Sequence, residues 1–434
     1  MKQKMGLLAL SSVILLGSSY AAAQDVPVSS STYIPLIEEQ TSDVENPQIV
    51  LLLSDVLEEA RNNNQEILAA KKRWEAEKAK IWAVKTWEDP ELGVEFWGTN
   101  ETWYDVSQKV PFPGKKLLKG KAQQHEAGEV EELYKAKEKE ILQKVKSAYY
   151  SYFLAIRQIE IFEESVSLLK RFSKVAENKY SVNRTGQLDV LKAQVEYFKS
   201  LNALVTLRQE KETVEAELNA LLNRRPDSSL GKPVEPGLAP FDISYDDLVK
   251  IAQANRPEVR SARHHVEQTK ADLRVAWSEF LPDTYFQYSR RTFDNDEKDD
   301  NIFIVKFNVP AWIWGKGSAV KSARKTKEEA QAMLQSVETM TYSDVKSMLV
   351  KTQTARRLME LYKTSVIPQA ETSLKVSTAG YEAGNIGFLD LLDSERTWLE
   401  FQMEYYQYLA QYWTYLAALE RVVGEDLVPF EGVR

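Results

Sequence analysis

The chain has 434 residues, of which 43% are hydrophobic and 28% are charged, and this balance excludes a disordered protein. Its net charge of −8 argues against a nucleic-acid partner, because phosphate binding needs a basic face. The sequence contains no cysteine, which excludes disulfides, thiol catalysis and thiolate metal sites.

The first 23 residues have the pattern of a signal peptide. Lys2 and Lys4 precede an apolar run, and three alanines at 21–23 predict cleavage before Gln24. Residues 24–50 are polar and punctuated by proline, so we expect an extended N-terminal arm. Beyond this point the sequence has no run of about 20 apolar residues, so no transmembrane helix is predicted. We therefore expect a periplasmic or secreted protein, or one that enters an outer membrane as a β-barrel.

Residues 51–223 predict a first structural repeat that consists mainly of helices. Ser54 is expected to cap the first helix, and Asp89-Pro90 is expected to end it. The long helix of this repeat contains no proline and has apolar residues at a coiled-coil spacing, over a length of roughly 100 Å. The expected elements are a helix over 54–87, a β-hairpin over 91–110 with strands at 91–99 and 102–110, a long helix over 115–180, a tight tip, and a helix over 187–223.

The tip sequence recurs later in the chain and defines a second repeat. The stretch from Tyr180 to Leu191 reappears 201 residues later, from Tyr381 to Leu392, with Tyr, Gly, Leu, Asp and Leu in the same register. Pro368 is expected to kink the second long helix. The expected segments are a linker over 224–242, the second repeat over 243–424 with a helix, a hairpin over 283–310, a long helix over 316–381, a tip and a helix over 388–423, and a tail over 425–434.

The two hairpins suggest a membrane-spanning sheet that a single chain cannot complete. Strands of this length cross a bilayer when they are tilted, but four strands cannot close a barrel and lipid tolerates no open edge. Several chains would therefore be needed. Aromatic residues flank the strands and suit the interfacial girdles of such a barrel: Phe96, Trp97, Trp103, Tyr104, Tyr285, Phe286, Trp312 and Trp314. The alternative is a pair of soluble hairpins packed on helices.

Three features of the sequence occur together: the duplicated tips, the stretch Asp89-Pro-Glu-Leu92, and the stretch Val106-Ser-Gln-Lys-Val-Pro-Phe-Pro-Gly-Lys115. Taken in this order, they resemble the TolC-like outer-membrane efflux family, in its heavy-metal and RND branch. The resemblance covers residues 54–424. It implies a mainly α fold with a small β part, in which internally duplicated coiled-coil hairpins accompany four strands of a trimeric 12-stranded outer-membrane barrel. The implied location is the outer membrane, with a long periplasmic extension. The implied partners are two further copies of the chain, a periplasmic adaptor, an RND-type inner-membrane transporter and outer-membrane lipid.

The resemblance also implies a gate at the periplasmic end. Asp390 and Asp393 match the family's acidic ring, while Tyr381 and Asp189 match positions that hold the closed state. Ile386 departs from the family pattern, since some relatives have a basic residue there. Asp is also common at solvated helix starts, which is the alternative interpretation of the two aspartates. The tips themselves are expected to contact the adaptor through Asn183, Gly186, Gly384 and Gly387. Asn183 aligns with Gly384, and these two residue types readily adopt a positive φ.

No other constellation predicts chemistry. His125, His264 and His265 do not make a transition-metal site without further ligands, and the acidic stretch 293–300 lacks the glycine and closing glutamate of a calcium loop. We therefore expect no cofactor and no catalysis. The predicted function is a passive exit duct for small solutes, with heavy-metal cations or drugs as candidate substrates. The alternatives are the outer component of a type I protein-secretion system and a soluble periplasmic coiled-coil scaffold.

Overall fold

The computed structural model describes residues 50–97, 101–237, 242–293 and 298–428. The described residues all belong to one compact unit. The predicted signal peptide and all of the predicted arm except Val50 lie outside the described residues, as do residues 294–297 of the acidic stretch 293–300. No helix in the described part of the chain is long and apolar enough to cross a membrane.

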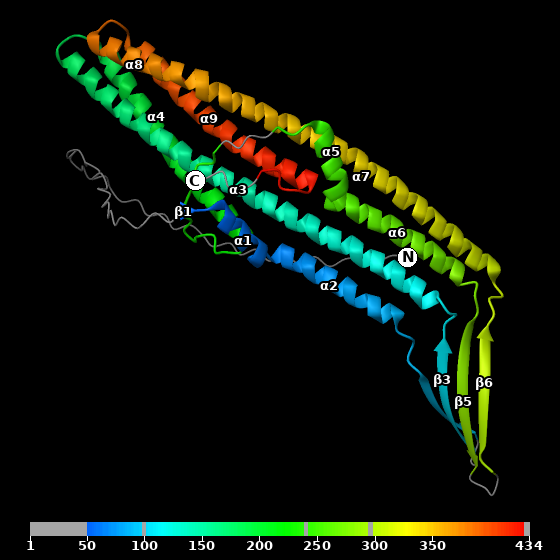
Figure 1. The fold of residues 1–434 in the computed structure, drawn as a ribbon. Coiled ribbons are helices and arrows are strands. Elements are labelled where there is room, and N and C mark those ends of the chain that lie inside the picture. Colours follow the sequence, from blue (N-terminus) through cyan, green and yellow to red (C-terminus); the bar gives the residue numbers. More distant parts are fainter. Residues whose placement is uncertain (1–49, 98–100, 238–241, 294–297, 429–434) are drawn as a thin grey trace, which may run out of the picture. The chain divides into compact units, whose positions relative to one another are not determined.

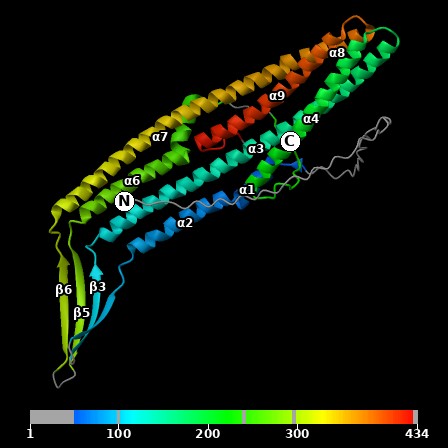
Figure 2. The same ribbon diagram turned by 180° about the vertical axis from the view of Figure 1, so that it is seen from behind.

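The same order of elements occurs twice along the chain (Figures 1 and 2). Each series has two short helices in succession, a β-hairpin, a long helix, a tip and a returning helix. The first series is α1 (Leu53–Asn63), α2 (Gln65–Lys85), β2 (Glu91–Trp97), β3 (Glu101–Val110), α3 (Lys115–Ser181) and α4 (Gln187–Leu221). The second is α5 (Tyr245–Asn255), α6 (Pro257–Ser278), β5 (Asp283–Phe293), β6 (Asp300–Asn308), α7 (Ile313–Leu361), the π-helix η1 (Tyr362–Val366), α8 (Ile367–Ala383) and α9 (Phe388–Val423).

The single helix expected over 54–87 is in fact two helices, which meet at Asn64. The backbone of Asn64 is extended, and its side-chain oxygen accepts hydrogen bonds from the N–H groups of Glu66 and Ile67. Its amide also donates to the carbonyl oxygen of Leu221 at 2.9 Å. A buried asparagine that caps a new helix start thus ends the previous helix. The predicted cap was also wrong, because Leu52 occupies that position and Ser54 instead donates to Asp55.

The expected disturbance at Pro368 takes the form of a π-helical turn just before the proline. Proline has no N–H to donate to the carbonyl four residues earlier, and its ring crowds that carbonyl. At the end of η1 the backbone N–H of Ile367 donates to the carbonyl oxygen of Tyr362, five residues back. Helical hydrogen bonding therefore continues through this point with a wider turn.

The four long strands form one antiparallel sheet in the order β2-β3-β5-β6. A second, two-stranded sheet pairs β1 (Val50–Leu51) in parallel with β4 (Lys232–Pro233), which lies in the predicted linker. Tyr149 of α3 joins these two segments, because its hydroxyl donates to the carbonyl oxygen of Leu51 at 2.9 Å and accepts from the N–H of Val234 at 3.1 Å.

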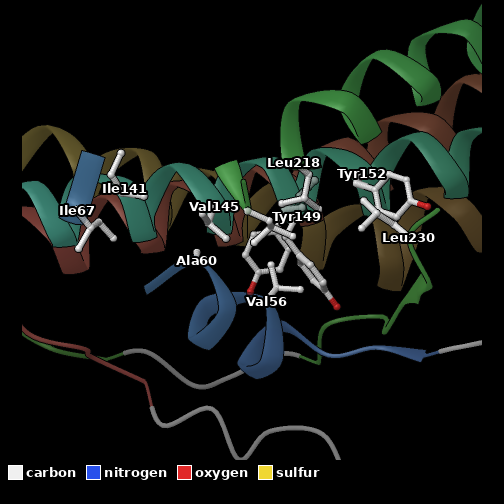
Figure 3. Packing of buried hydrophobic residues seen from close by; sticks show 12 residues of the cluster. Val56, Ala60, Ile67, Ile141, Val145, Tyr149, Tyr152, Leu218 and Leu230 are labelled. Atoms are coloured by element: carbon white, nitrogen blue, oxygen red, sulfur yellow. The ribbon is translucent and has the colours of Figure 1, made fainter. Parts of the chain in front are cut away.

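The helices that lead to the sheet lie side by side in the order α2-α3-α6-α7 (Figures 1 and 2). Hydrophobic residues are buried between α3 and its neighbours. Figure 3 shows one such cluster, in which α1 and α2 pack on α3 together with α4 and the linker; its labelled members are Val56, Ala60, Ile67, Ile141, Val145, Tyr149, Tyr152, Leu218 and Leu230.

Candidate functional site: the helix tips and the sheet

Both tips close with the same backbone hydrogen bonds. In the first tip, the N–H of Arg184 donates to the carbonyl of Lys179 at 2.8 Å, and Asn183 adopts a φ of 55°. In the second tip, the N–H of Asn385 donates to Gly380 at 2.8 Å, and Gly384 adopts a φ of 83°. These bonds satisfy carbonyls at the end of each long helix, as a left-handed terminal residue permits. The positive φ expected at both positions is present.

One lysine of the first tip holds the tyrosine of the second. The ammonium of Lys179 donates to the carbonyl oxygen of Tyr381 and lies 4.3 Å from the centre of its ring. The Tyr381 ring is buried and packs on Phe388, with 5.4 Å between ring centroids. Burial raises the pKa of Tyr381, and the negative charge of Asp189 adds to this effect. The structure thus places two predicted gate residues, Tyr381 and Asp189, close to each other.

Lys179 was not predicted as a functional residue, although comparison of the two repeats shows that it has no charged counterpart in the second copy. The residue 201 positions later is Gly380, so only the first copy has the charge. Ile386 occupies the space at that glycine, because a Cβ on Gly380 would lie 3.4 Å from the Ile386 side chain. Ile386, which departs from the family pattern, therefore contributes to the apolar packing of the second tip.

The predicted acidic residues lie at the helix starts that follow each tip. Asp189 is the third residue of α4, and its carboxylate accepts a hydrogen bond from the Thr185 hydroxyl. Asp390 is the third residue of α9, and its carboxylate accepts from the N–H of Gly387 at 3.2 Å. Asp390 and Asp393 are both exposed on the first turns of α9. They can therefore face a solvent-filled space, while Asp390 also caps its helix.

Behind the second tip a carboxyl group is buried. Glu395 of α9 is 2% exposed, and it accepts a hydrogen bond from the Ser165 hydroxyl of α3. Burial raises the pKa of Glu395, against the opposing effects of Ser165 and Arg396. Desolvation thus favours the protonated carboxyl group here.

At the other end of the long helices, the sheet has one apolar and one polar face. Cross-strand partners point to the same side, so the register assigns each residue to a face. One face has mostly apolar and aromatic side chains, many of them exposed: Leu92, Val94, Phe96, Tyr104, Val106, Phe286, Tyr288, Phe303, Val305 and Phe307. The opposite face has mostly polar ones, among them Glu91, Glu95, Asp105, Ser107, Lys109, Gln287, Ser289, Arg291 and Lys306.

This register divides the predicted girdle aromatics of the strands between the two faces of the sheet. Only Phe96, Tyr104 and Phe286 of the predicted strand aromatics lie on the apolar face. Side chains alternate with a period of two along a strand, so Trp97, Trp103 and Tyr285 lie on the polar face. There Arg291 lies 5.5 Å from the centre of the Trp103 ring, and Lys109 lies 5.9 Å from that of Tyr285. Trp312 and Trp314 are exposed where the chain passes from β6 to α7.

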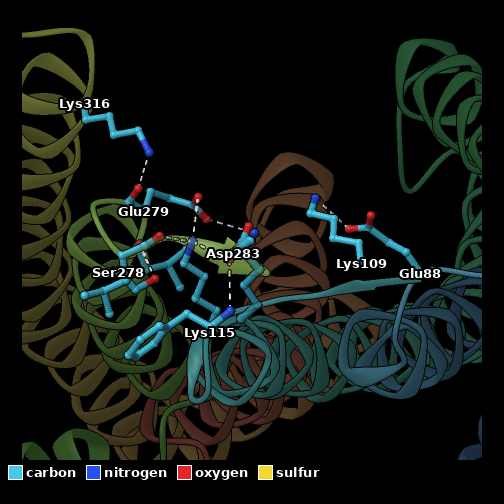
Figure 4. A network of polar contacts seen from close by, with 11 residues as sticks. Glu88, Lys109, Lys115, Ser278, Glu279, Asp283 and Lys316 are labelled. Carbon is cyan, nitrogen blue, oxygen red and sulfur yellow. Dashed lines mark hydrogen bonds and ion pairs between the residues drawn. The ribbon is translucent and has the colours of Figure 1, made fainter. Parts of the chain in front are cut away.

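A buried lysine joins the helices to the sheet. Lys115 is 4% exposed, and its ammonium donates to Asp283 and to the carbonyl oxygen of Leu281, both at 2.8 Å (Figure 4). Asp283 also accepts from the N–H of Phe112 at 3.0 Å. Lys316 of α7 donates to the carbonyl oxygen of Glu279 close by. These contacts fix the start of α3 against the strand that follows α6.

The sequence profile described as "Outer membrane efflux protein" matches residues 56–224 and 248–425, which together make up most of the chain. The chain belongs to the outer membrane efflux protein family. It is 22% identical over 391 residues to the cobalt-zinc-cadmium resistance protein CzcC of Cupriavidus metallidurans, covering 86% of this chain and 90% of that protein. It is 21% identical over 328 residues to the outer membrane protein TolC of Escherichia coli, covering 70% and 66%. Its fold resembles the crystal structure of CusC with a TM-score of 0.76 at 17% identity, over 86% of this chain and 92% of that one.

Membership places this efflux protein in the outer membrane, as the sequence predicted. The fold is the expected one, mainly helical with a small sheet. The outer-membrane location contradicts the alternative prediction of a soluble periplasmic scaffold.

The histidines of the efflux protein lie together without forming a metal site. The rings of His125 and His264 are 6.2 Å apart, and the Nδ1 atom of His265 lies 2.9 Å from the carboxylate of Glu129. Among the described residues, no group of three His, Cys, Asp or Glu side chains has a metal-binding arrangement.

Proposed function

We propose that this efflux protein is the passive exit duct of a tripartite system. It would act as a homotrimer with a periplasmic adaptor and an RND-type inner-membrane transporter, and the transporter would supply the energy. The observation that carries the proposal is the sheet. In the described residues its outer strands β2 and β6 each pair on one side only, and its apolar face is exposed.

A trimer would satisfy both features of the sheet. Three copies supply twelve strands, an even number that can close into a barrel without an open edge. The apolar face would contact lipid, and the polar face would line the water-filled lumen. Trp97, Trp103 and Tyr285 would then line the lumen, while Phe96, Tyr104 and Phe286 would lie at the lipid surface.

The tips would form the periplasmic opening. Asp390 and Asp393 of three copies would form an acidic ring, and Tyr381 with Asp189 would hold the neighbouring helices closed. The exposed tip residues Asn183, Gly186, Gly384 and Gly387 would contact the adaptor. The exported compounds would be small solutes. Similarity to a cobalt-zinc-cadmium resistance protein supports metal cations as the first substrates to test.

Export in a strain that lacks the gene tests the proposal. We expect the strain to become sensitive to zinc, cobalt or cadmium, and the native gene to restore resistance only when adaptor and transporter are present. The purified protein should have the mass of three chains in mild detergent and should conduct ions in a planar bilayer. A stable, folded monomer without conductance would contradict the proposal.

A further inference from the structure

A charged cavity lies beside residues 132–146 of α3, where α9 ends and α6 begins (Figure 1). Its volume is about 390 Å³, which suits a small molecule. Arg421 of α9 reaches Glu258 of α6 here, at 3.4 Å. None of the lining residues belongs to the tips or to the long-stranded sheet, so the cavity is separate from the proposed gate and barrel.

The acidic side chains that line the cavity already have partners within the chain. Glu132 forms ion pairs with Lys135 at 2.9 Å and with Arg260 at 3.0 Å. Glu420 pairs with Lys146 at 2.6 Å. The remaining carboxylates have these partners: Arg61 for Glu138, Lys146 for Asp426, and Asn255 for Glu425. The negative charge of the cavity is therefore neutralised from inside.

Three polar groups of the lining are left over. In the part of the chain that the structure describes, the ammonium of Lys139 has no hydrogen-bond or ion-pair partner. Within the same residues, the buried Nε of Arg421 has no acceptor, and the buried Oε2 of Glu132 has no donor. Glu132 is only 2% exposed, and a buried polar atom without a partner destabilises the folded state. The cavity thus offers two cationic donors and one anionic acceptor.

We propose that this cavity binds hydrogen phosphate. Its unprotonated oxygens would accept hydrogen bonds from Lys139 and Arg421, and its hydroxyl would donate to Oε2 of Glu132. Six basic and five acidic side chains line the cavity, so the balance of charge favours an anion. Hydrogen bonds between such ionised groups are strong.

Glu132 would select among oxyanions by requiring a proton on the ligand. Sulfate has the same shape as phosphate but no proton at neutral pH, so one of its oxygens would face the Glu132 carboxylate and be repelled. A phosphate monoester loses its second proton near about pH 6, so at about pH 8 it also lacks the hydroxyl. Inorganic phosphate keeps a proton at that pH. A site that depends on a ligand hydroxyl discriminates strongly against analogues that lack it.

The internal repeat forms the equivalent junction without these charges. Val145 of α3 and Val345 of α7 are both fully buried and align the two long helices. Leu218 of α4 and Leu419 of α9 are also fully buried and align the returning helices. The counterparts of the three unpartnered groups are then uncharged: Ala332, Thr339 and Ala220. The fold itself therefore does not require a charged cavity at this place.

A bound phosphate would connect helices that meet only at this junction. Glu132 and Lys139 belong to α3, and Arg421 belongs to α9. Glu132 also holds Arg260 of α6. Because the unfolded chain does not bring these groups together, phosphate binding would stabilise the folded protein.

Calorimetric titration of the purified, full-length native protein in detergent tests the proposal. The buffer is free of phosphate, at about pH 8 and low ionic strength, and the probes are inorganic phosphate, sulfate and glycerol 3-phosphate. We expect inorganic phosphate to bind at one site per chain, and the other two anions to bind at least about a hundredfold more weakly. Absence of phosphate binding, or equal binding of phosphate and sulfate, would overturn the proposal.

Two variants with matched controls assign the site to its residues. Lys139→Gln should weaken phosphate binding by at least about tenfold, because a charged donor is lost. Lys144→Gln should leave it unchanged, since Lys144 pairs with Glu140 and does not line the cavity. If the two variants bound phosphate equally well, the ligand would lie elsewhere and the proposal would fail.

Glu132→Gln tests the selection directly. The amide of glutamine donates a hydrogen bond, so this variant should lose at least about tenfold of the preference for phosphate over sulfate. Glu131→Gln is the control, because Glu131 also pairs with Lys135 but lies outside the cavity lining. An unchanged preference in a folded Glu132→Gln variant would remove Glu132 from the site. Should this variant not fold, the lysine variants and the native anion series still decide. None of these outcomes affects the proposed exit duct, whose test is export and conductance.

Discussion

The ammonium of Lys179 lies 4.3 Å from the centre of the Tyr381 ring, and the same group donates a hydrogen bond to the Tyr381 carbonyl oxygen. One side chain of the first tip thereby holds both the ring and the backbone of the second. The repeat provides no equivalent bond in the opposite direction, because Gly380 stands where a second lysine would be. The contact between Lys179 and Tyr381 is therefore one-sided, and a single substitution can remove it.

Replacing Lys179 with Met should loosen this contact between the tips. We expect a loss of about 1–2 kcal/mol of tip stability, the usual range for a hydrogen bond from a charged group together with a cation–π contact. Single-channel recording should show a larger or more frequent open conductance. Lys174→Met, at a position on the same helix, is the matched control. Unchanged conductance in the Lys179 variant would remove this residue from the gate.

Gly384→Val should strain the second tip, because a β-branched residue would be forced to a φ of 83°. The expected cost is about 1–2 kcal/mol. Export and crosslinking to the adaptor should fall, while the trimer and its membrane insertion persist. Asn183→Gly is the control, since glycine accepts the φ of 55° at the equivalent position without strain. Normal export by the valine variant would show that this tip conformation does not matter for docking.

The acidic ring predicts block by multivalent cations added on the periplasmic side. Hard carboxylate oxygens that are concentrated around an axis bind such ions. Replacing both Asp390 and Asp393 with Asn should weaken the block by about tenfold or more and lower cation preference. Asn keeps an acceptor for the Gly387 N–H, so the helix start should remain intact, whereas Ala would also remove the cap. If the double variant is blocked at the same cation concentration as the native channel, the two aspartates do not form a cation-binding ring and only belong to a solvated helix start.

The raised pKa of Glu395 predicts that the free energy of unfolding falls as the pH rises. Its pKa in the folded protein is raised above the unfolded value of 4.5, mainly by burial, so the folded state binds this proton more tightly. The stabilising effect of protonation is complete below pH 4.5 and is lost as the pH rises through the folded pKa. Glu395→Gln should remove this loss and raise the free energy of unfolding at about pH 8. Thermal dissociation of the trimer, measured against pH, checks this.

The control for this titration is Glu400→Gln, an exposed position on the same helix. It should leave the pH dependence as it is in the native protein. If the Glu395→Gln variant and the native protein lost stability in parallel between about pH 5 and pH 8, another group would be responsible for the change.

Periodicity in the sequence was enough to predict most of the helices and strands. Long proline-free segments and period-two alternation are strong signals because each reflects one buried face. The break at Asn64 was not predicted, since its cause is a side chain that caps α2 and also reaches Leu221, far away in the sequence. A contact between distant segments leaves no local pattern to recognise.

The site was predicted less completely than the fold. The positive φ at Asn183 and Gly384 followed from residue type, because few residues tolerate that backbone conformation. Lys179, the partner of Tyr381, could not be predicted from its residue type, because lysine is common on any solvated helix. The division of the aromatic residues between two faces was present in the alternation itself. Trp97 follows Phe96 directly, and adjacent residues in a strand cannot share a face.

The hydrogen bonds of Tyr149 have a consequence for synthesis. The tyrosine hydroxyl holds Leu51 and Val234, so every atom in this arrangement belongs to the first 234 residues. A chain that emerges N-terminus first can therefore tie β1, its long helix and the start of its linker together before α6 to α9 exist. The first half would then present α3 as a ready surface on which the second half assembles, in keeping with the stepwise folding of large chains.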